Sequence, residues 1–226
     1  MKNPVVDYRE FRFSKINDPS YSHLKLLLGW VVYFILYFLT ENLIPAGKCH
    51  VIHCRLDDLI PFNEFFLIFY VSWYFLIVGS LLYFMLYDID SFRKLSIFIM
   101  ITQAVAMAVY ILYPSRQDLR PVFFERDNIL TQLMALIYAF DTNTGVFPSL
   151  HVAYSLGIAS VWWKKKDFSI LWRIFIVILA VVISIATTFV KQHSALDVLG
   201  AIPVALLAEY LIYRKKLFEK KTPSMP

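Results

Sequence analysis

The feature of this sequence that most limits its fold is a series of six apolar runs, each long enough to cross a membrane. A crossing helix needs about 20 residues, because each residue adds about 1.5 Å along a hydrocarbon core about 30 Å thick. The sequence therefore predicts an all-α, polytopic membrane protein that folds as a single domain, residues 1–226. The predicted six-helix bundle has spans at residues 24–44, 62–87, 95–113, 146–163, 168–190 and 194–213.

Composition supports a membrane protein and excludes other classes. Apolar side chains make up 59% of the chain and the mean hydropathy is +0.60, whereas soluble domains contain about 45–50% apolar residues. The net charge of +5 comes from Lys and Arg beside apolar runs, where they face lipid headgroups. We therefore expect a membrane and no nucleic acid as the partner. Acidic residues precede a first run that is long enough to span, so we expect no cleavable signal peptide.

Lys and Arg are divided unequally between alternate connectors. If both termini are cytoplasmic, the inner segments hold fourteen of them and the outer segments hold six. Because positively charged loops stay in the cytoplasm, we predict both termini inside, with the plasma membrane as the expected location. The long connector, residues 114–145, then lies outside. Its segment Asn128–Phe140 predicts an extra helix with Asp127 as N-cap, on the membrane surface or over the bundle.

Two polar motifs occur at this outer face before the last spans. In YPSRQDLRP, residues 113–121, the guanidinium groups of Arg116 and Arg120 match phosphate oxygens well. The alternative, headgroup anchoring, is the better interpretation for Arg116. In GVFPSLHV, residues 145–152, Pro148 and Ser149 predict a helix start whose free amides can bind an anion. His151 would project from its first turn, as a chemical group or as a packing residue.

The third motif, TTFVKQHSALD at Thr187–Asp197, lies at the junction of the fifth and sixth spans. A helix that begins at His193 would place Asp197 one turn away, so that its carboxylate accepts a proton from one imidazole nitrogen and leaves the other free. A satisfied polar pair at a helix end is the alternative. Two histidines, one with a carboxylate, together with cations and helix amides fit phosphoryl transfer through a phosphohistidine. This chemistry requires no metal and no cofactor.

Three short motifs resemble those of a known superfamily. RP at 120–121, PSLH at 148–151 and HSALD at 193–197 are similar in order to the motifs of the type 2 phosphatidic acid phosphatase (lipid phosphate phosphatase) superfamily, a six-helix membrane fold. PSLH with KQH resembles the branch that includes inositol phosphorylceramide synthase and sphingomyelin synthase relatives. The resemblance implies the following roles: His193 as nucleophile, Asp197 as its orienting partner, His151 as general acid, and Arg120 and Ser149 as phosphate ligands.

Two positions depart from the superfamily pattern. It has a Lys seven residues before the Arg of RP and an Arg six residues before the nucleophilic His, where this chain has Tyr113 and Thr187. Lys191, one helical turn from Thr187, is expected to replace the missing Arg, and Arg116 is expected to cover for Tyr113.

The motifs imply a membrane lipid phosphatase that hydrolyses a phosphomonoester or diphosphate. One alternative is a phosphotransferase that moves a phospho-headgroup to an alcohol, since both reactions use the same residues. A non-enzymatic transporter or scaffold is a second alternative, which the missing cations leave open. The lipid and the oligomeric state stay open.

Three polar groups lie outside these motifs. CHVIHC, which starts at Cys49 and ends at Cys54, is open to zinc, a local disulfide or a loop role, but four tetrahedral ligands do not fit so short a segment. Asp57 and Asp58 are expected to cap or brace the second span. Glu209 and Arg173 lie in predicted spans and are left outside the site.

Overall fold

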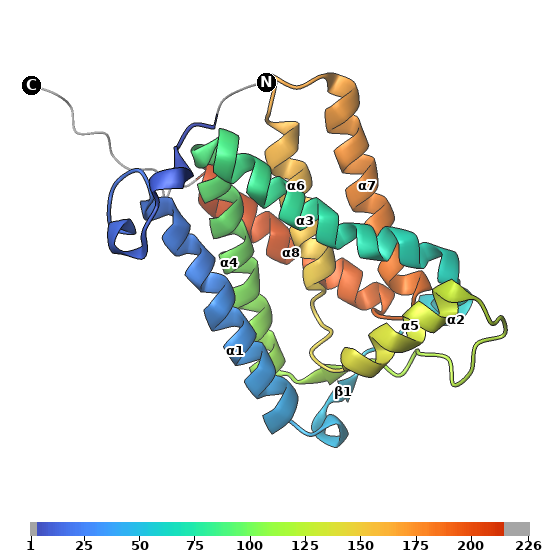
Figure 1. Ribbon diagram of the computed structural model, residues 1–226. Helices are drawn as coiled ribbons and strands as arrows, with labels where there is room; N and C mark the ends of the chain where they lie inside the picture. Colours follow the sequence, from blue (N-terminus) through green and yellow to red (C-terminus); the bar gives the residue numbers. More distant parts are fainter. Residues whose placement is uncertain (1–3, 215–226) are drawn as a thin grey trace, which may run out of the picture.

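The computed structural model describes residues 4–214 and is mostly helical (Figure 1). Five helices have the length and apolar composition of membrane spans, which identifies an integral membrane protein. They are α1 (Leu28–Leu43), α3 (Leu67–Tyr87), α4 (Ile89–Leu112), α7 (Ile170–Phe189) and α8 (Ala195–Glu209). A 3-10 turn, Ser22–Leu27, precedes α1, and a π-helical turn, Tyr210–Arg214, extends α8. The basic residues counted beyond Arg214 lie outside the described residues.

The fourth predicted span differs from the prediction. It forms α6, Leu150–Trp163, which has 14 residues and is therefore about 21 Å long, shorter than a hydrocarbon core of about 30 Å. The predicted start at Val146 is wrong because the chain makes a turn through the cis Phe147–Pro148 peptide and the helix begins only after Ser149, its N-cap. The expected count of six spans is thus confirmed only for five.

Although short, α6 lies at the centre of the bundle. It packs against α4, α7 and α8, and most of its residues are buried. Glycines allow this close approach: a Cβ on Gly157 would lie 2.4 Å from the ring of Phe98 on α4. A Cβ on Gly200 of α8 would lie 2.4 Å from the Phe147 ring. Both contacts hold α6 and its preceding turn against their neighbours.

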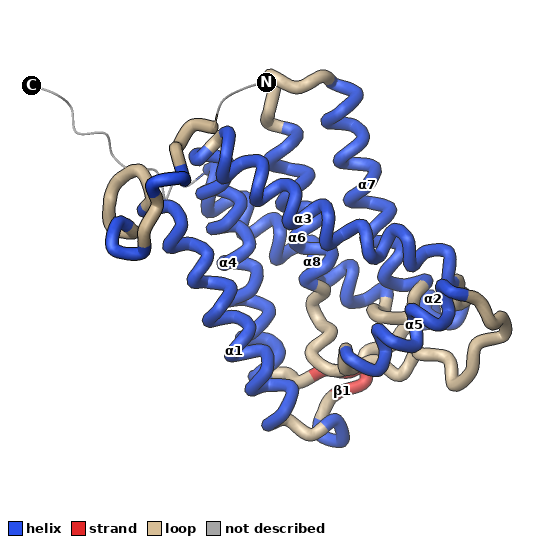
Figure 2. The backbone as a smooth tube through the Cα atoms, viewed as in Figure 1, coloured by secondary structure: helices blue, strands red, loops and turns tan. Residues whose placement is uncertain are grey.

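The connectors that carry the polar motifs gather at one end of the bundle, the lower end in Figures 1 and 2. A two-stranded parallel sheet links two of them, β1 (His50–Val51) from the α1–α3 connector and β2 (Ser115–Arg116) from the α4–α6 connector. The short helix α2 (Arg55–Leu59) follows β1. The turn between α7 and α8 lies at this same end, so the three motifs lie together at one end of the bundle.

The extra helix predicted in the long connector is confirmed as α5, Ile129–Phe140. Its N-cap is Asn128 and not Asp127, because the Asn128 side chain and Thr131 form a capping box. Met134 is fully buried against Leu67 and Val190. The helix therefore packs over the bundle, which is one of the two positions expected for it.

The polar groups outside the motifs have structural partners. Cys49 and Cys54 are free thiols, and no cluster suited to a metal ion occurs among residues 4–214. Glu209 pairs with Lys164 at 2.5 Å, and Arg173 donates to the carbonyl of Trp163.

Candidate active site

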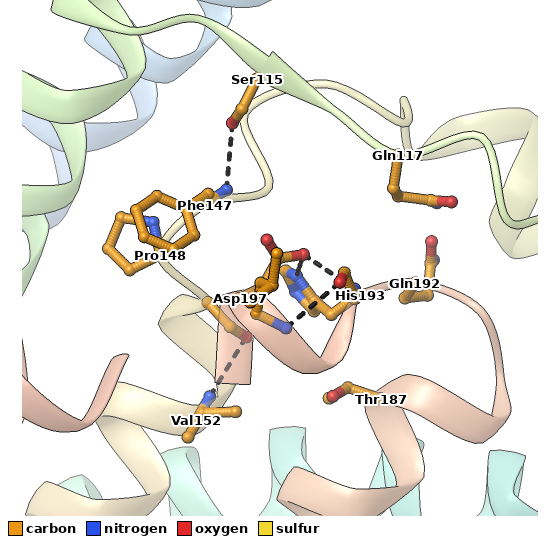
Figure 3. Close-up of polar contacts among 12 residues, drawn as sticks. Ser115, Gln117, Phe147, Pro148, Val152, Thr187, Gln192, His193 and Asp197 are labelled. Carbon is orange, nitrogen blue, oxygen red and sulfur yellow. Dashed lines mark hydrogen bonds and ion pairs between the residues drawn. The ribbon is translucent and has the colours of Figure 1, made fainter. Parts of the chain in front are cut away.

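His193 and Asp197 meet at the turn between α7 and α8. The amides of Gln192 and His193 both donate to the carbonyl of Thr187, at 3.0 and 3.1 Å, which reverses the chain. His193 Nδ1 then lies 3.2 Å from Asp197 Oδ2 (Figure 3). Asp197 is fully buried and His193 is 8% exposed. We place the imidazole proton on Nδ1, where the carboxylate accepts it, so Nε2 keeps its lone pair.

His193 and Asp197 are paired as predicted, but they do not lie on one turn of a helix, because His193 precedes the N-cap of α8. Helix α8 begins at Ala195 with Ser194 as N-cap, so His193 precedes the helix. Asp197 Oδ2 also accepts from the Ser194 amide at 2.9 Å, which completes a capping box. One carboxylate oxygen therefore fixes both the helix start and the imidazole.

His151 lies in the first turn of α6 and faces His193. Their ring centroids are 5.5 Å apart. The imidazole of His151 stacks on Tyr70 and packs on Trp73, with centroid distances of 4.9 and 4.3 Å. Its Nε2 is buried and has no hydrogen-bond partner in the described part of the chain. A buried polar atom without a partner costs free energy, so this nitrogen is suited to a ligand.

Ser149 is fully buried and joins α6 to α8. Its amide donates to the Asp197 carbonyl at 3.1 Å, and its hydroxyl accepts from the Val152 amide at 3.5 Å. This N-cap role orients the first turn that carries His151.

Arg120 organises the wall beside the histidines. Its guanidinium donates to the carbonyls of Asp141 and Thr142, at 2.9 and 2.8 Å, and to that of Tyr138. It also donates to Gln192 Oε1 at 2.7 Å, and Gln192 precedes His193. The guanidinium thus caps the carboxyl end of α5 and holds the side chain of the residue that precedes His193.

The structure does not bring Lys191 or Arg116 to the histidines. The Lys191 ammonium donates to the carbonyls of Asp57, at 2.9 Å, and Ile60. Burial lowers the pKa of Lys191, against the opposing effect of Asp57. Arg116 donates to the Ala46 carbonyl at 2.9 Å and pairs with Asp118 at 3.1 Å. The two expected replacements for missing cations are therefore occupied elsewhere.

Asp57 has a role that the sequence did not indicate. It was expected to brace the second span, but its Oδ1 accepts from the Ala195 amide at 2.7 Å, and its Oδ2 accepts from the Ser194 hydroxyl at 2.5 Å. It therefore fixes the start of α8. A capping box with Cys54 was the available local signal, but that signal does not specify a contact 138 residues away.

The two histidines line a cavity of about 650 Å³. Helices α1, α3, α5 and α6 form its walls, largely with aromatic and aliphatic side chains. Polar groups at one end include Asp141, Thr142 and Gln192, which sequence analysis missed because none belongs to a catalytic pair. No Lys or Arg is among the described residues that line it.

The site therefore combines an oriented imidazole, a second imidazole without a partner, and a large apolar cavity. These groups are suited to nucleophilic attack and proton transfer on an amphiphilic ester. Comparisons of the chain with protein-family models, with curated proteins and with solved structures find no match, so its resemblance to the phosphatase superfamily rests on the three motifs.

Proposed function

We propose that this protein is a membrane enzyme that cleaves a lipid phosphate ester through a phosphohistidine at His193, with water as the final acceptor. The observation that carries the proposal is the buried His193–Asp197 pair facing His151 at the polar end of the cavity. A satisfied structural pair would not require a second imidazole with a buried nitrogen that has no partner.

The reaction follows from the geometry. His193 Nε2 attacks phosphorus, an N–P bond forms, and the P–O bond to the lipid alcohol breaks. His151, when protonated, transfers its proton to the leaving oxygen. A water then attacks phosphorus, gives its proton to His151 and breaks the N–P bond. Amides in the first turn of α6 stabilise the negative charge on the phosphoryl oxygens, and so does Arg120, which donates to Gln192 Oε1.

The apolar walls support a lipid substrate. Three cavity residues on different helices, Phe34, Val78 and Phe140, are 58%, 61% and 83% exposed. They lie at the outer surface of apolar helices, so the cavity opens sideways toward the hydrocarbon region. A lipid can place its phosphate near His193 while its chains stay between the helices or in the bilayer.

A second candidate is transfer of the phosphorus group to an alcohol. Thr142 and Asp141 at the polar end favour it, because they can hold the hydroxyl of an acceptor. Product analysis by mass separates this reaction from hydrolysis.

The test uses the purified protein in lipid nanodiscs. Phosphatidic acid, lysophosphatidic acid, isoprenyl diphosphate and three phosphodiester lipids, phosphatidylglycerol, phosphatidylinositol and phosphatidylethanolamine, are each supplied, and released phosphate, phospho-headgroup and lipid alcohol are measured. We expect turnover of at least one lipid and an acid-labile phosphohistidine, both lost in His193→Ala. His50→Ala is the matched control, since His50 stacks on Tyr113 away from the cavity. No turnover of any lipid, or equal turnover by His193→Ala, rejects the proposal in favour of a transporter or scaffold.

A further inference from the structure

Helix α5 has two apolar faces, and the bundle covers only one of them. On the covered face Thr131 and Met134 are buried, and the Tyr138 hydroxyl donates to the Val190 carbonyl at 2.7 Å. The opposite side, which we call the open face, carries four large apolar side chains that are between 44% and 83% exposed: Ile129, Leu133, Leu136 and Phe140. The described part of the chain leaves this face uncovered.

The residues of the open face form one stripe along the helix. At 3.6 residues per turn, their four positions fall within an arc of about 60°. No residue from Ile129 to Phe140 is charged, and Gln132 is the only polar residue exposed within that range. A helix that met water on this side would present polar or charged groups there. A contiguous apolar stripe instead indicates an interaction surface.

The position of α5 along the bundle shows what surrounds this stripe. Met134 forms one buried cluster with Leu67 in the first turn of α3 and Ala186 in the last turn of α7. Both of these helices are membrane spans, and α5 lies across their lower end in Figure 1. Ile68 and Phe69, in the same turn of α3, are 58% and 41% exposed. The helix therefore lies beside apolar, outward-facing parts of the spans and not beyond them.

The open face is also continuous with the surface that the spans present to lipid. Leu136 and Phe140 line the cavity together with Phe34 of α1 and Val78 of α3, two exposed residues on membrane-spanning helices. One apolar surface thus extends from the spans, past the mouth of the cavity, onto α5. With 12 residues, α5 is about 18 Å long and is too short to cross a hydrocarbon core of about 30 Å.

We infer that the partner of the open face is the lipid bilayer, and that α5 is an interfacial helix inserted among the first carbons of the acyl chains at this end of the bundle. Insertion removes the four large apolar side chains from water, which stabilises this position. The inference goes beyond the proposed function and does not depend on it. Its consequence is that the mouth of the cavity, between α5 and the spans, lies within the leaflet.

Spin labels on the full chain in proteoliposomes test this placement. Cys49→Ala and Cys54→Ser remove the native thiols, and the serine hydroxyl can still cap α2. Single cysteines are then introduced as Leu133→Cys on the open face and as Ala135→Cys, an exposed position about 160° away around the helix.

Two further positions provide the references. Phe75→Cys, at a residue of α3 that is 75% exposed and does not line the cavity, reports the hydrocarbon region. Lys48→Cys, in the exposed connector after α1, reports water. Relaxation of each label is measured with molecular oxygen, which concentrates in the bilayer, and with a water-soluble nickel chelate.

The expected pattern is one-sided. The label at position 133 should be accessible to oxygen, as at position 75, and roughly tenfold less accessible to the nickel chelate than the label at position 48, because an interfacial helix buries its apolar face about 5–10 Å into the leaflet. The label at position 135 should lie nearer to water. Accessibility at 133 equal to that at 48, or equal at 133 and 135, overturns the inference. Shielding of 133 from both reagents also overturns it, because a protein surface such as a second copy then covers the face.

A second measurement uses the unsubstituted protein, so that no variant has to fold. A phospholipid with a diazirine on its acyl chain is photolysed in the same vesicles, and the labelled peptides are identified by mass. We expect adducts on residues 129–140 and on α3, and none on residues 45–49 of the connector after α1. Adducts on α3 without any on residues 129–140 overturn the inference. Neither measurement depends on turnover, so loss of the proposed activity would leave this result unchanged.

Discussion

The side-chain ammonium of Lys191 donates to the backbone carbonyl of Asp57 at 2.9 Å, and the carboxylate of Asp57 accepts from the first amide of α8. The two residues therefore bind each other's segments, and the α2 region fixes the turn that presents His193. Lys191 itself has a left-handed backbone, with φ of 52°. In this arrangement the lysine supports the site through the fold and not through contact with phosphate.

Lys191→Met should destabilise the protein. The substitution keeps an unbranched apolar stem but leaves the carbonyls of Asp57 and Ile60 without their charged donor, which costs about 2 kcal/mol. We expect a lower midpoint of thermal unfolding in nanodiscs, with kcat of the remaining folded protein reduced by less than tenfold. If kcat instead falls as far as in His193→Ala while stability is unchanged, Lys191 contacts the phosphate.

His151→Ala should slow the reaction in a way that depends on the leaving group. A general acid contributes typically 10²–10⁴-fold, and it matters most when the leaving alkoxide is basic. We expect a large loss of kcat on an alkyl phosphate ester of a lipid and a much smaller loss on the matching 4-nitrophenyl ester. His193→Ala should lose both activities equally. Equal losses on the two esters in His151→Ala would show that His151 does not protonate the leaving group.

Asp197→Asn should reduce turnover without removing the nucleophile. The amide oxygen can still cap the Ser194 amide, but the charge that stabilises the Nδ1 proton of His193 is lost. We expect kcat to fall roughly a hundredfold or more, as for other imidazoles that lose their orienting carboxylate. Thermal unfolding measured in parallel provides the control. A variant with unchanged stability and full kcat would contradict the role of Asp197.

Asp141→Asn should stabilise the protein at neutral pH. Burial raises the pKa of Asp141 above its ordinary 3.8, although Arg120 and His193 act in the opposite direction. A raised folded pKa means that ionisation opposes folding: the relative stability is full below pH 3.8 and is lost as pH rises through the folded pKa. The gain from Asn should therefore appear at pH 7 and vanish at pH 3, as read by thermal unfolding. A gain that is equal at both pH values would contradict this account.

Gly157→Ala should disturb the contact between α6 and α4. The new methyl would lie 2.4 Å from the Phe98 ring, so the helices must separate or the ring must move, at a cost of about 1–3 kcal/mol. We expect a lower unfolding midpoint and partial recovery when Phe98→Leu is added. Gly79→Ala on α3 is the matched control, because nothing lies within 4 Å of its added methyl. A double variant less stable than the sum of both changes would contradict the predicted clash.

Local sequence signals predicted much of the fold. Apolar length predicted five spans within a few residues of their observed ends, apart from α4, which starts six residues earlier at Ile89 because Asp88 caps it. The same signal failed for α6, since a length count does not show that residues before Ser149 form a turn. An N-cap signal and the grouping of apolar residues on one side also predicted α5 in the long connector.

The sequence by itself determined the five long apolar helices and α5, the pairing of His193 with Asp197, and the gathering of three motifs at one end, because these depend on apolar length and on residues within one turn. The tertiary structure decided which polar groups reach the cavity. It directed the Lys191 ammonium to the carbonyls of Asp57 and Ile60, and it placed Arg120 against the carbonyl of Asp141 at the end of α5. It also brought Asp141 to Gln192, the residue before His193. Those outcomes depend on buried hydrogen bonds between segments far apart in the chain, and a buried donor goes to whichever acceptor the packing provides.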